Sequence, residues 1–285
     1  MRGIIDVGSN SVRLGVFDCD YEVYSETVTT RLGSGLIKTN KMNEEDIANT
    51  VLAISRFVKI CESYNVTPEA FGTAACRQAE NASELLKRVR NDCGVDIRVL
   101  SGEDEAKIAF FGGCVLTNSF PCAVIDVGGA STEIAVGDEE RLYFSKSYPI
   151  GAVKAYGGCL ESKEETRRYV ETAFEGLKKL DANTVIAIGG TATSLSSVLS
   201  GEKRYDKSVT HGFTIKRSAL DALCNDLFDM GLEGRCELSM ITQKRAEIIA
   251  SGAMIFRVLM EKLDLQEITT SESDNLYGYT KVFEK

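Results

Sequence analysis

The sequence predicts an α/β protein of two similar lobes, related by internal duplication, with a ligand-binding cleft between them. The first observation is a repeat: residues 4–18, IIDVGSNSVRLGVFD, return as residues 124–138, VIDVGGASTEIAVGD, with seven identities in fifteen positions. In each copy a strand ends in Asp-Val-Gly and a second strand follows the turn. The length of 285 residues also suits two cores of ordinary size. We expect a first lobe at 1–119 and a second at 120–285, whose tail helix can pack on the first lobe.

The sequence of the first lobe predicts secondary-structure elements in the order βββαβαβα, which is typical of a mixed sheet covered by helices. Asn43 stands at the N-cap position of a helix whose apolar residues recur every three or four positions. Asn81 and Glu84 resemble a capping box that opens a second helix. The elements expected after the first hairpin are strands at 21–32, 69–75 and 95–100 and helices at 43–64, 82–93 and 103–116.

The second half repeats this pattern and adds helices. A strand at 184–190 runs directly into a helix that starts at Thr191, so a third glycine turn, at Gly189 and Gly190, opens on a helix N-terminus. The other expected elements are a hairpin from 123, a strand near 142–152, a loose insertion at 201–215, helices at 163–180, 218–230 and 242–263, a last strand at 267–273 and a tail helix at 274–283.

Composition and charge exclude several classes of protein. The net charge of −9 argues against sequence-independent binding to nucleic acid or to an anionic membrane. Nine cysteines without C-x-x-C spacing and a single histidine argue against a zinc site or a disulfide framework. The N-terminus lacks the pattern of a signal or transit peptide, and no apolar run reaches the roughly 20 residues that span a bilayer. We therefore expect a cytoplasmic protein.

The glycine turns are suited to bind phosphate. Glycine lets the backbone approach a ligand closely, consecutive amides can point into one concavity, and hydroxyls add donors. Asp and Gly are also ordinary turn residues, but two equivalent turns and a third at a helix N-terminus favour a cleft closed on phosphate from both sides. The candidate phosphate ligands are Gly8, Ser9, Asn10, Ser11, Arg13, Gly128, Gly129, Ser131, Thr132, Gly189, Gly190 and Thr191.

Three carboxylates beside the turns are candidate metal ligands. Asp6, Asp126 and Glu133 cannot bind phosphate directly because like charges repel. Magnesium keeps its waters and bridges carboxylates to phosphate oxygens, so it is the expected cofactor. Glu133 could instead be an exposed strand residue. It shares a strand face with Ser131, which favours the metal role.

Glu105 is the candidate general base. Acids in the first turn of a helix commonly face its dipole, which accounts for Glu103 and Asp104. Glu105 lies three to four residues before apolar positions of the packed face and should point into the cleft, where a carboxylate can deprotonate water. Arg77 follows a strand and can stabilise charge on a phosphoryl group, although a surface ion pair also explains it. For His211, a hydrogen bond within its loop competes with a catalytic role.

A set of motifs across nearly the whole chain resembles the Ppx/GppA family of exopolyphosphatases and guanosine pentaphosphate phosphohydrolases. The motifs are DVGSNSVRL, GTAACRQAEN, LSGEDEAKIAFFG, VIDVGGASTE, IGGTATSL, THG and KRAEIIASGAMIF. The resemblance implies two ribonuclease-H-like lobes of the actin-like ATPase superfamily. It also implies magnesium-dependent removal of a terminal phosphate from inorganic polyphosphate, or of the 5′ γ-phosphate from guanosine pentaphosphate.

The resemblance also assigns roles to single residues. The family's base falls on Glu105, its magnesium ligands on Asp126 and Glu133, and its motif arginine on Arg77. The chain departs from the family at Ala130, where glycine is usual, so this turn requires a negative φ at residue 130. Near the C-terminus Leu-Tyr-Gly at 276–278 replaces a common Leu-Arg-Glu-Gly run. The chain also ends where larger relatives continue into a helical domain.

Several alternatives remain open at the level of sequence. The chain could be an ATP-dependent small-molecule kinase of the same superfamily, or a non-catalytic nucleotide-binding switch. The sequence does not rank polyphosphate against guanosine pentaphosphate. A basic stretch at 203–207 could follow a polyanion or be a solvated loop face. A homodimer is plausible from the frequency of two-fold oligomers.

Overall fold

Two mixed sheets form the framework of the protein in a computed structural model that describes residues 1–159 and 162–283. The first sheet has the strand order β3-β2-β1-β4-β5; β1 to β3 are antiparallel, and β1, β4 and β5 run parallel. Its strands are β1 (Arg2–Val7), β2 (Ser11–Asp18), β3 (Tyr21–Thr29), β4 (Pro68–Gly72) and β5 (Ile97–Val99).

The second sheet repeats this topology and adds one strand. Its order is β10-β11-β9-β6-β7-β8, so β8-β7-β6-β9-β11 corresponds to the whole first sheet. The strands are β6 (Cys122–Val127), β7 (Thr132–Gly137), β8 (Leu142–Tyr148), β9 (Thr184–Ile188), β10 (Thr214–Lys216) and β11 (Glu267–Thr270). The repeated hairpins also share their register, because Asp6 pairs with Arg13 and Asp126 pairs with Glu133. The predicted duplication is confirmed.

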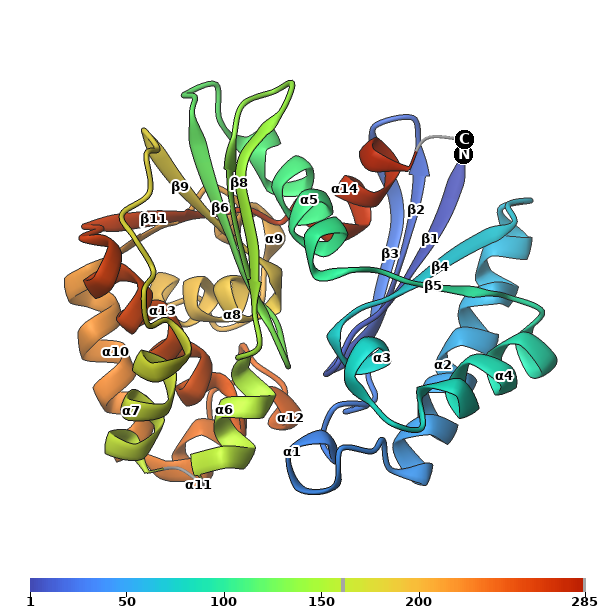
Figure 1. Ribbon diagram of the computed structural model, residues 1–285, viewed down its shortest axis with the longest axis horizontal. Coiled ribbons are helices and arrows are strands. Elements are labelled where there is room, and N and C mark those ends of the chain that lie inside the picture. Colours follow the sequence, from blue (N-terminus) through green and yellow to red (C-terminus); the bar gives the residue numbers. More distant parts are fainter. Residues whose placement is uncertain (160–161, 284–285) are drawn as a thin grey trace.

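Helices pack on the outer faces of both sheets (Figure 1). In the first lobe, apolar residues of the sheet and of α2, such as Ile54 and Phe57, form one buried core. In the second lobe, α13 contributes ten buried residues to a larger core. Apart from the two helices between the sheets, the helices are α1 (Leu36–Thr39), α2 (Glu44–Ser63), α3 (Ala74–Gln78), α4 (Ala82–Cys93), α6 (Ala152–Cys159), α7 (Lys163–Ala173), α8 (Gly189–Ser200), α9 (Lys207–Thr210), α10 (Arg217–Asp229), α11 (Gly231–Cys236), α12 (Gln243–Ala246) and α13 (Ile249–Leu263).

Some local predictions are wrong, each for a tertiary reason. Asn81 does not cap α4 with its side chain, because its amide exchanges two hydrogen bonds with the backbone of Met42. The single helix predicted at 242–263 is broken between α12 and α13. There Arg235 Nε donates to the carbonyl of Ala246 at 2.8 Å, an acceptor that a continuous helix would use internally.

The two remaining helices lie between the sheets. Figure 1 shows α5 (Gly102–Gly113), which continues into a short 3₁₀ helix (Cys114–Leu116), against the second sheet, and α14 (Asn275–Val282) against the first. The chain therefore exchanges helices: α5, expected within the first lobe, packs through Phe110 on β6, β7 and β9. The boundary at residues 119 and 120 stays a prediction.

Glycines let α5 and α14 meet at backbone distance. A Cβ atom at Gly278 would lie 1.8 Å from the carbonyl oxygen of Ile108, and one at Gly112 would lie 2.1 Å from that of Asp274. No side chain fits at either position, so this helix pair has a fixed register. In the described part of the chain, no helix has both the length and the apolar character needed to cross a bilayer.

Candidate active site

A cavity of about 510 Å³ lies between the two lobes, a size typical of small-molecule sites. The two repeated turns and the start of α8 line it, together with Glu105 from α5. The predicted site residues on its wall are Asp6, Gly8, Ser9, Asn10, Ser11, Arg13, Glu105, Asp126, Gly128, Gly129, Ser131, Gly189 and Gly190. The structure therefore brings most of the predicted residues to one place.

The repeated turns face each other across this cavity. Each is closed by the same backbone hydrogen bond, Gly8 N to Ser11 O at 3.1 Å and Gly128 N to Ser131 O at 3.0 Å. A Cβ atom at Gly129 would lie 3.0 Å from Cβ of Ser9. Such close facing turns can surround one small anion with backbone amides. Ala130 is not among the described residues with positive φ, so it meets the condition that the sequence set for this turn.

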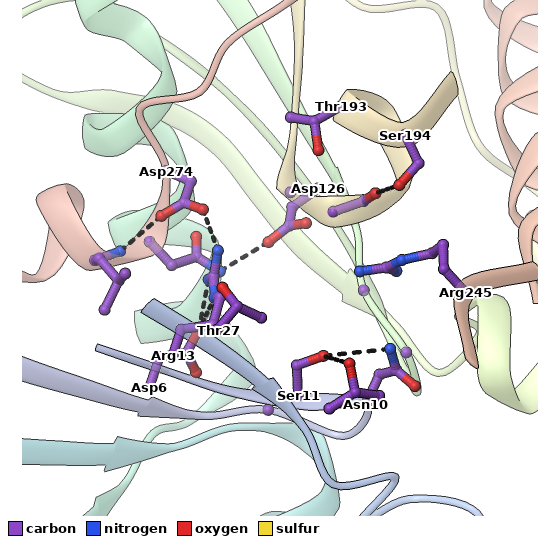
Figure 2. A pocket seen from close by; sticks show the side chains of 18 of the residues that line it. Asp6, Asn10, Ser11, Arg13, Thr27, Asp126, Thr193, Ser194, Arg245 and Asp274 are labelled. Carbon is purple, nitrogen blue, oxygen red and sulfur yellow. Dashed lines mark hydrogen bonds and ion pairs between the residues drawn. The ribbon is translucent and has the colours of Figure 1, made fainter. Parts of the chain in front are cut away.

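Arg13 neutralises the aspartate of the first turn. It donates from Nε to Asp6 Oδ2 at 3.0 Å and also forms an ion pair with Asp274 (Figure 2). Burial raises the pKa of Asp6, and the charge of Arg13 opposes this shift. Burial acts against the charge of Arg13, but Asp274 and Asp6 outweigh it and raise its pKa. Arg13 therefore binds carboxylates in this structure, although it was predicted as a phosphate ligand.

The second turn carries a glutamate at the position equivalent to Arg13. Glu133 is 1% exposed and accepts a hydrogen bond from Ser147 Oγ at 2.6 Å. Burial, with repulsion from Glu105 and Asp126, raises the pKa of Glu133 well above its usual value. Burial also raises the pKa of Asp126 to about 7, against the opposing charge of Arg13 and a hydrogen bond from Asn275. The second turn thus carries two buried carboxyl groups whose charged forms are disfavoured in the absence of a cation.

Glu105 faces the cavity from α5. Its carboxylate accepts a hydrogen bond from Arg77 Nη1 at 2.9 Å, and the same nitrogen lies 2.8 Å from the carbonyl oxygen of Leu100. Burial raises the pKa of Glu105 to about 7, although the charge of Arg77 lowers it. A base with this pKa is matched to neutral pH. Glu103, on the same helix, is exposed, as its predicted role as a dipole partner requires.

Four predicted site residues do not line the cavity. Glu133 lies behind the wall, and Arg77 reaches the site only through Glu105. The hydroxyl of Thr132 donates to the carbonyl of Ile150 at 2.6 Å, and that of Thr191 donates to Val127 at 2.8 Å. The two threonine side chains therefore stabilise the backbone, which leaves neither hydroxyl proton for a phosphate.

Two cavity residues were not among the predicted site residues, although Arg245 lies within the motif KRAEIIASGAMIF. Arg245 follows the N-cap of α12, and its guanidinium packs on Gly190, where a Cβ would lie 2.3 Å from Nη2. Among the described residues it pairs with no carboxylate; burial and the charge of Arg13 lower its pKa to about 10. Figure 2 shows it pointing into the space between Asn10 and Ser194. Asn275, at the start of α14, binds Asp126. Only the tertiary structure brings these two residues to the turns.

The basic stretch contributes little to the cavity. Lys207 lines the wall, but its ammonium group is 2.9 Å from both Glu22 and Ser25 of the first lobe. His211 accepts a hydrogen bond from the amide of Glu272 at 3.2 Å, in agreement with the loop role considered for it.

The acidic groups fit a magnesium ion that keeps part of its water shell. Within residues 1–159 and 162–283, no three acidic, histidine or cysteine side chains form a ready-made metal cage. Magnesium is usually held by one or two carboxylates together with substrate phosphates, so a cage is not required. Asp6 Oδ1 is buried and has no hydrogen-bond partner among the described residues, so this wall offers an acceptor for metal-bound water.

Known proteins resemble this chain in sequence and in structure. Exopolyphosphatase 2 of Mycobacterium tuberculosis is 28% identical over 96% of this chain and 95% of its own length. The guanosine-5′-triphosphate,3′-diphosphate pyrophosphatase of Vibrio vulnificus is 26% identical over 93% of this chain and 55% of its own. A solved structure of the Aquifex aeolicus Ppx/GppA enzyme is 26% identical in sequence, the match covers 97% of each chain, and the TM-score is 0.80.

The fold of this structure, and of a second structure of the Aquifex aeolicus family member with a TM-score of 0.78, confirms the prediction of two ribonuclease-H-like lobes of the actin-like ATPase type. The model of the Ppx/GppA phosphatase family matches residues 18–274. The chain therefore belongs to the Ppx/GppA phosphatase family and is a hydrolase of phosphoanhydride bonds.

Proposed function

We propose that the protein removes the terminal phosphate from short inorganic polyphosphate or from guanosine pentaphosphate, with magnesium as cofactor. The observation that carries this proposal is the position of Glu105, a buried carboxylate with a pKa of about 7 on the wall that contains both glycine turns. Similarity to an exopolyphosphatase and to a guanosine pentaphosphate pyrophosphatase supports both substrates.

The terminal phosphate binds between the facing turns. Backbone amides of the two turns, with the hydroxyls of Ser9, Ser11 and Ser131, donate to its oxygens. These donors are fixed by the hairpins before substrate arrives, so they stabilise charge in the transition state without reorganising. The amides at Gly190 and Thr191, at the N-terminus of the twelve-residue helix α8, extend this anion site.

Glu105 deprotonates the attacking water. Arg77 holds the carboxylate by its hydrogen bond and keeps it ionised near neutral pH, so Arg77 acts by positioning the base. The role proposed for Arg77 from its place after a strand, direct contact with phosphate, is replaced by this indirect one.

The second lobe supplies the magnesium ligands in this proposal. No ion pair among the described residues holds Asp126 or Glu133, and burial raises the pKa of both, so a bound cation would favour their ionised forms; in the first lobe Arg13 already pairs with Asp6. Magnesium would neutralise charge on the phosphoryl oxygens during transfer. Asp6 would contribute through water, since its Oδ1 has no protein donor among the described residues.

The second phosphate of the substrate is expected at Arg245. Its guanidinium is the cation on the wall that no described carboxylate neutralises. Glu22, Glu26 and Glu272 also line the cavity; Lys207 pairs with Glu22 and Arg56 with Glu26, so the described wall offers no further unpaired cation to a long chain of phosphates. The cavity therefore favours a short substrate over a long polymer.

The test measures phosphate release with magnesium from short polyphosphate, long polyphosphate and guanosine pentaphosphate. No phosphoryl acceptor is added, so release also rules out a kinase reaction that requires one. Release from a short substrate, lost on chelation of magnesium, is the expected result. No release from any of the three, with tight binding of guanosine pentaphosphate, would instead establish a binding switch.

A further inference from the structure

Two adjacent residues at the start of α14 reach the matching aspartates of both repeats. Asn275 Nδ2 donates to Asp126 Oδ2 at 2.8 Å, across 149 positions of sequence. Asp274 forms an ion pair with Arg13, which in turn binds Asp6. Figure 2 shows the guanidinium of Arg13 between Asp274 and Asp6, with Asp126 beside it. The first turn of α14 therefore contacts the aspartate of each repeat, Asp126 directly and Asp6 through Arg13.

The contact between Asn275 and Asp126 is buried. Each residue is 5% exposed, so water does not compete for the carboxylate oxygen. Hydrogen bonds to an ionised carboxylate are among the stronger ones in proteins, and loss of the donor leaves a buried charge poorly satisfied. On the other side of the carboxylate, Asp126 Oδ1 would lie 2.4 Å from a Cβ at Gly189. The carboxylate of Asp126 therefore lies between the side-chain amide of Asn275 and the backbone of Gly189.

Helix capping does not account for Asn275. Asp274 is the N-cap residue, and its Oδ1 accepts the amide of Leu276 at 3.0 Å. The side chain of Asn275 makes no hydrogen bond within its own helix: its amide nitrogen binds Asp126, and its Oδ1 is buried without a partner among the described residues. An unsatisfied buried acceptor costs stability, which is unexpected for a residue that serves only the fold.

The anchoring of α14 makes its first turn suitable for holding other groups. The carbonyl of Asp274 packs against Gly112 of α5, and Gly278 packs against the carbonyl of Ile108, so α14 cannot slide along α5. Glu105 lies on α5. The proposed base and the residues that hold both aspartates are thus fixed to one helix pair.

We propose that Asn275 is a positioning residue that orients the carboxylate of Asp126 for magnesium, while Asp274 does the same for Asp6 through Arg13. This inference rests on the proposed function, because it assumes that Asp126 is a metal ligand. Residues that orient metal ligands typically contribute 10- to 100-fold to metal affinity.

The test compares Asn275→Leu and Asn275→Ala with the native protein and with Lys281→Ala. Leucine keeps the branched shape of asparagine, although it is larger, and it removes the unsatisfied Oδ1 as well as the donor, while alanine adds no bulk, so at least one of the two variants is expected to fold. Lys281 lies on the last turn of the same helix and pairs with Asp20 at the surface. Mn²⁺ binding with orthophosphate present is followed by electron paramagnetic resonance, and kcat and KM are measured at saturating magnesium.

Both Asn275 variants should bind Mn²⁺ about 10- to 100-fold more weakly and lose kcat more than KM changes, while Lys281→Ala matches the native protein. In an Asp126→Asn background, Asn275→Leu should cause no further loss of kcat, because its effect acts through Asp126. Native Mn²⁺ affinity in a folded Leu variant, or additive losses of kcat, would overturn the inference while leaving the hydrolase intact. A native protein that binds no Mn²⁺ and releases no phosphate would refute the proposed function as well.

Discussion

Replacing Glu105 by glutamine tests the proposed base most directly. Glutamine has the same size and keeps an oxygen that can accept the hydrogen bond from Arg77, but it cannot take a proton from water. The side chain is 4% exposed, and the change removes a buried charge, so the fold should persist.

The expected loss follows from the chemistry of general bases. Proton transfer by a positioned carboxylate contributes about 10²- to 10⁴-fold, so kcat should fall by that factor, or about 2.7 to 5.4 kcal/mol in barrier height. KM should change little, because Glu105 does not hold the phosphate. Glu103→Gln, an exposed position on the same helix, should keep the native rate.

The dependence of kcat on pH supplies a second readout. Burial raises the pKa of Glu105 to about 7, so the carboxylate loses its basic form as pH falls through this value. The native rate should drop by at least about tenfold per unit between pH 7 and pH 5, and the rate of Glu105→Gln should fall less steeply, because Glu105 no longer titrates and Asp126, whose pKa is also about 7, is left to titrate in this range. Initial rates of phosphate release across this range measure both effects. A Gln variant with native kcat, or with the native pH profile, would remove Glu105 from the mechanism.

Three further changes separate binding, structure and packing. Arg245→Met removes the cation without a carboxylate partner, so KM for short polyphosphate should rise at least tenfold with a smaller change in kcat; an unchanged KM would exclude its contact with substrate. Thr132→Val removes a hydroxyl that donates to the carbonyl of Ile150, so urea denaturation should show a free energy of unfolding lower by about 1 to 3 kcal/mol. The kcat of the folded variant should equal that of the native protein. Gly278→Ala places a Cβ 1.8 Å from the carbonyl oxygen of Ile108 and should lower the free energy of unfolding by at least about 2 kcal/mol. Gly158→Ala in α6 is the control, because its Cβ would lie no closer than 3.6 Å to a neighbouring atom, and it should not lower stability in this way. Equal stability of the two variants would contradict the close contact between α5 and α14.

The repeat made the framework predictable from sequence. Two copies of a strand, a glycine turn and a strand fix the two hairpins, and the β1–β2 and β6–β7 registers match residue for residue. The position of Glu105 was also accessible, because helical spacing orients it relative to Ile108. Local patterns of this kind depend on residues close in sequence, and those are the patterns that the sequence shows.

Contacts between distant segments could not be predicted in this way. Asn81 has the identity of a cap but binds Met42, and Thr132 has the identity of a phosphate ligand but binds Ile150. In both cases the side chain forms a hydrogen bond with a backbone group that only folding brings close. Asn275 reaches Asp126 across 149 positions of sequence, so no local pattern marks it. Arg245 lies within the motif KRAEIIASGAMIF, but nothing local shows that its guanidinium packs on Gly190 and reaches the cavity.

The exchange of α5 and α14 has a consequence for how the two halves depend on each other. The first sheet buries Ile4, Phe17 and Phe71 under Leu276 and Tyr279 of the tail, and the second sheet buries Val124 under Phe110. A fragment that ends at residue 119 would leave the first of these apolar surfaces in water, and its complement would leave the second. Fragments 1–119 and 120–285 should therefore aggregate when each is expressed alone, and they should reassemble into an active protein when they are expressed together. Duplication in this chain has thus produced two repeats that are obligate partners of each other.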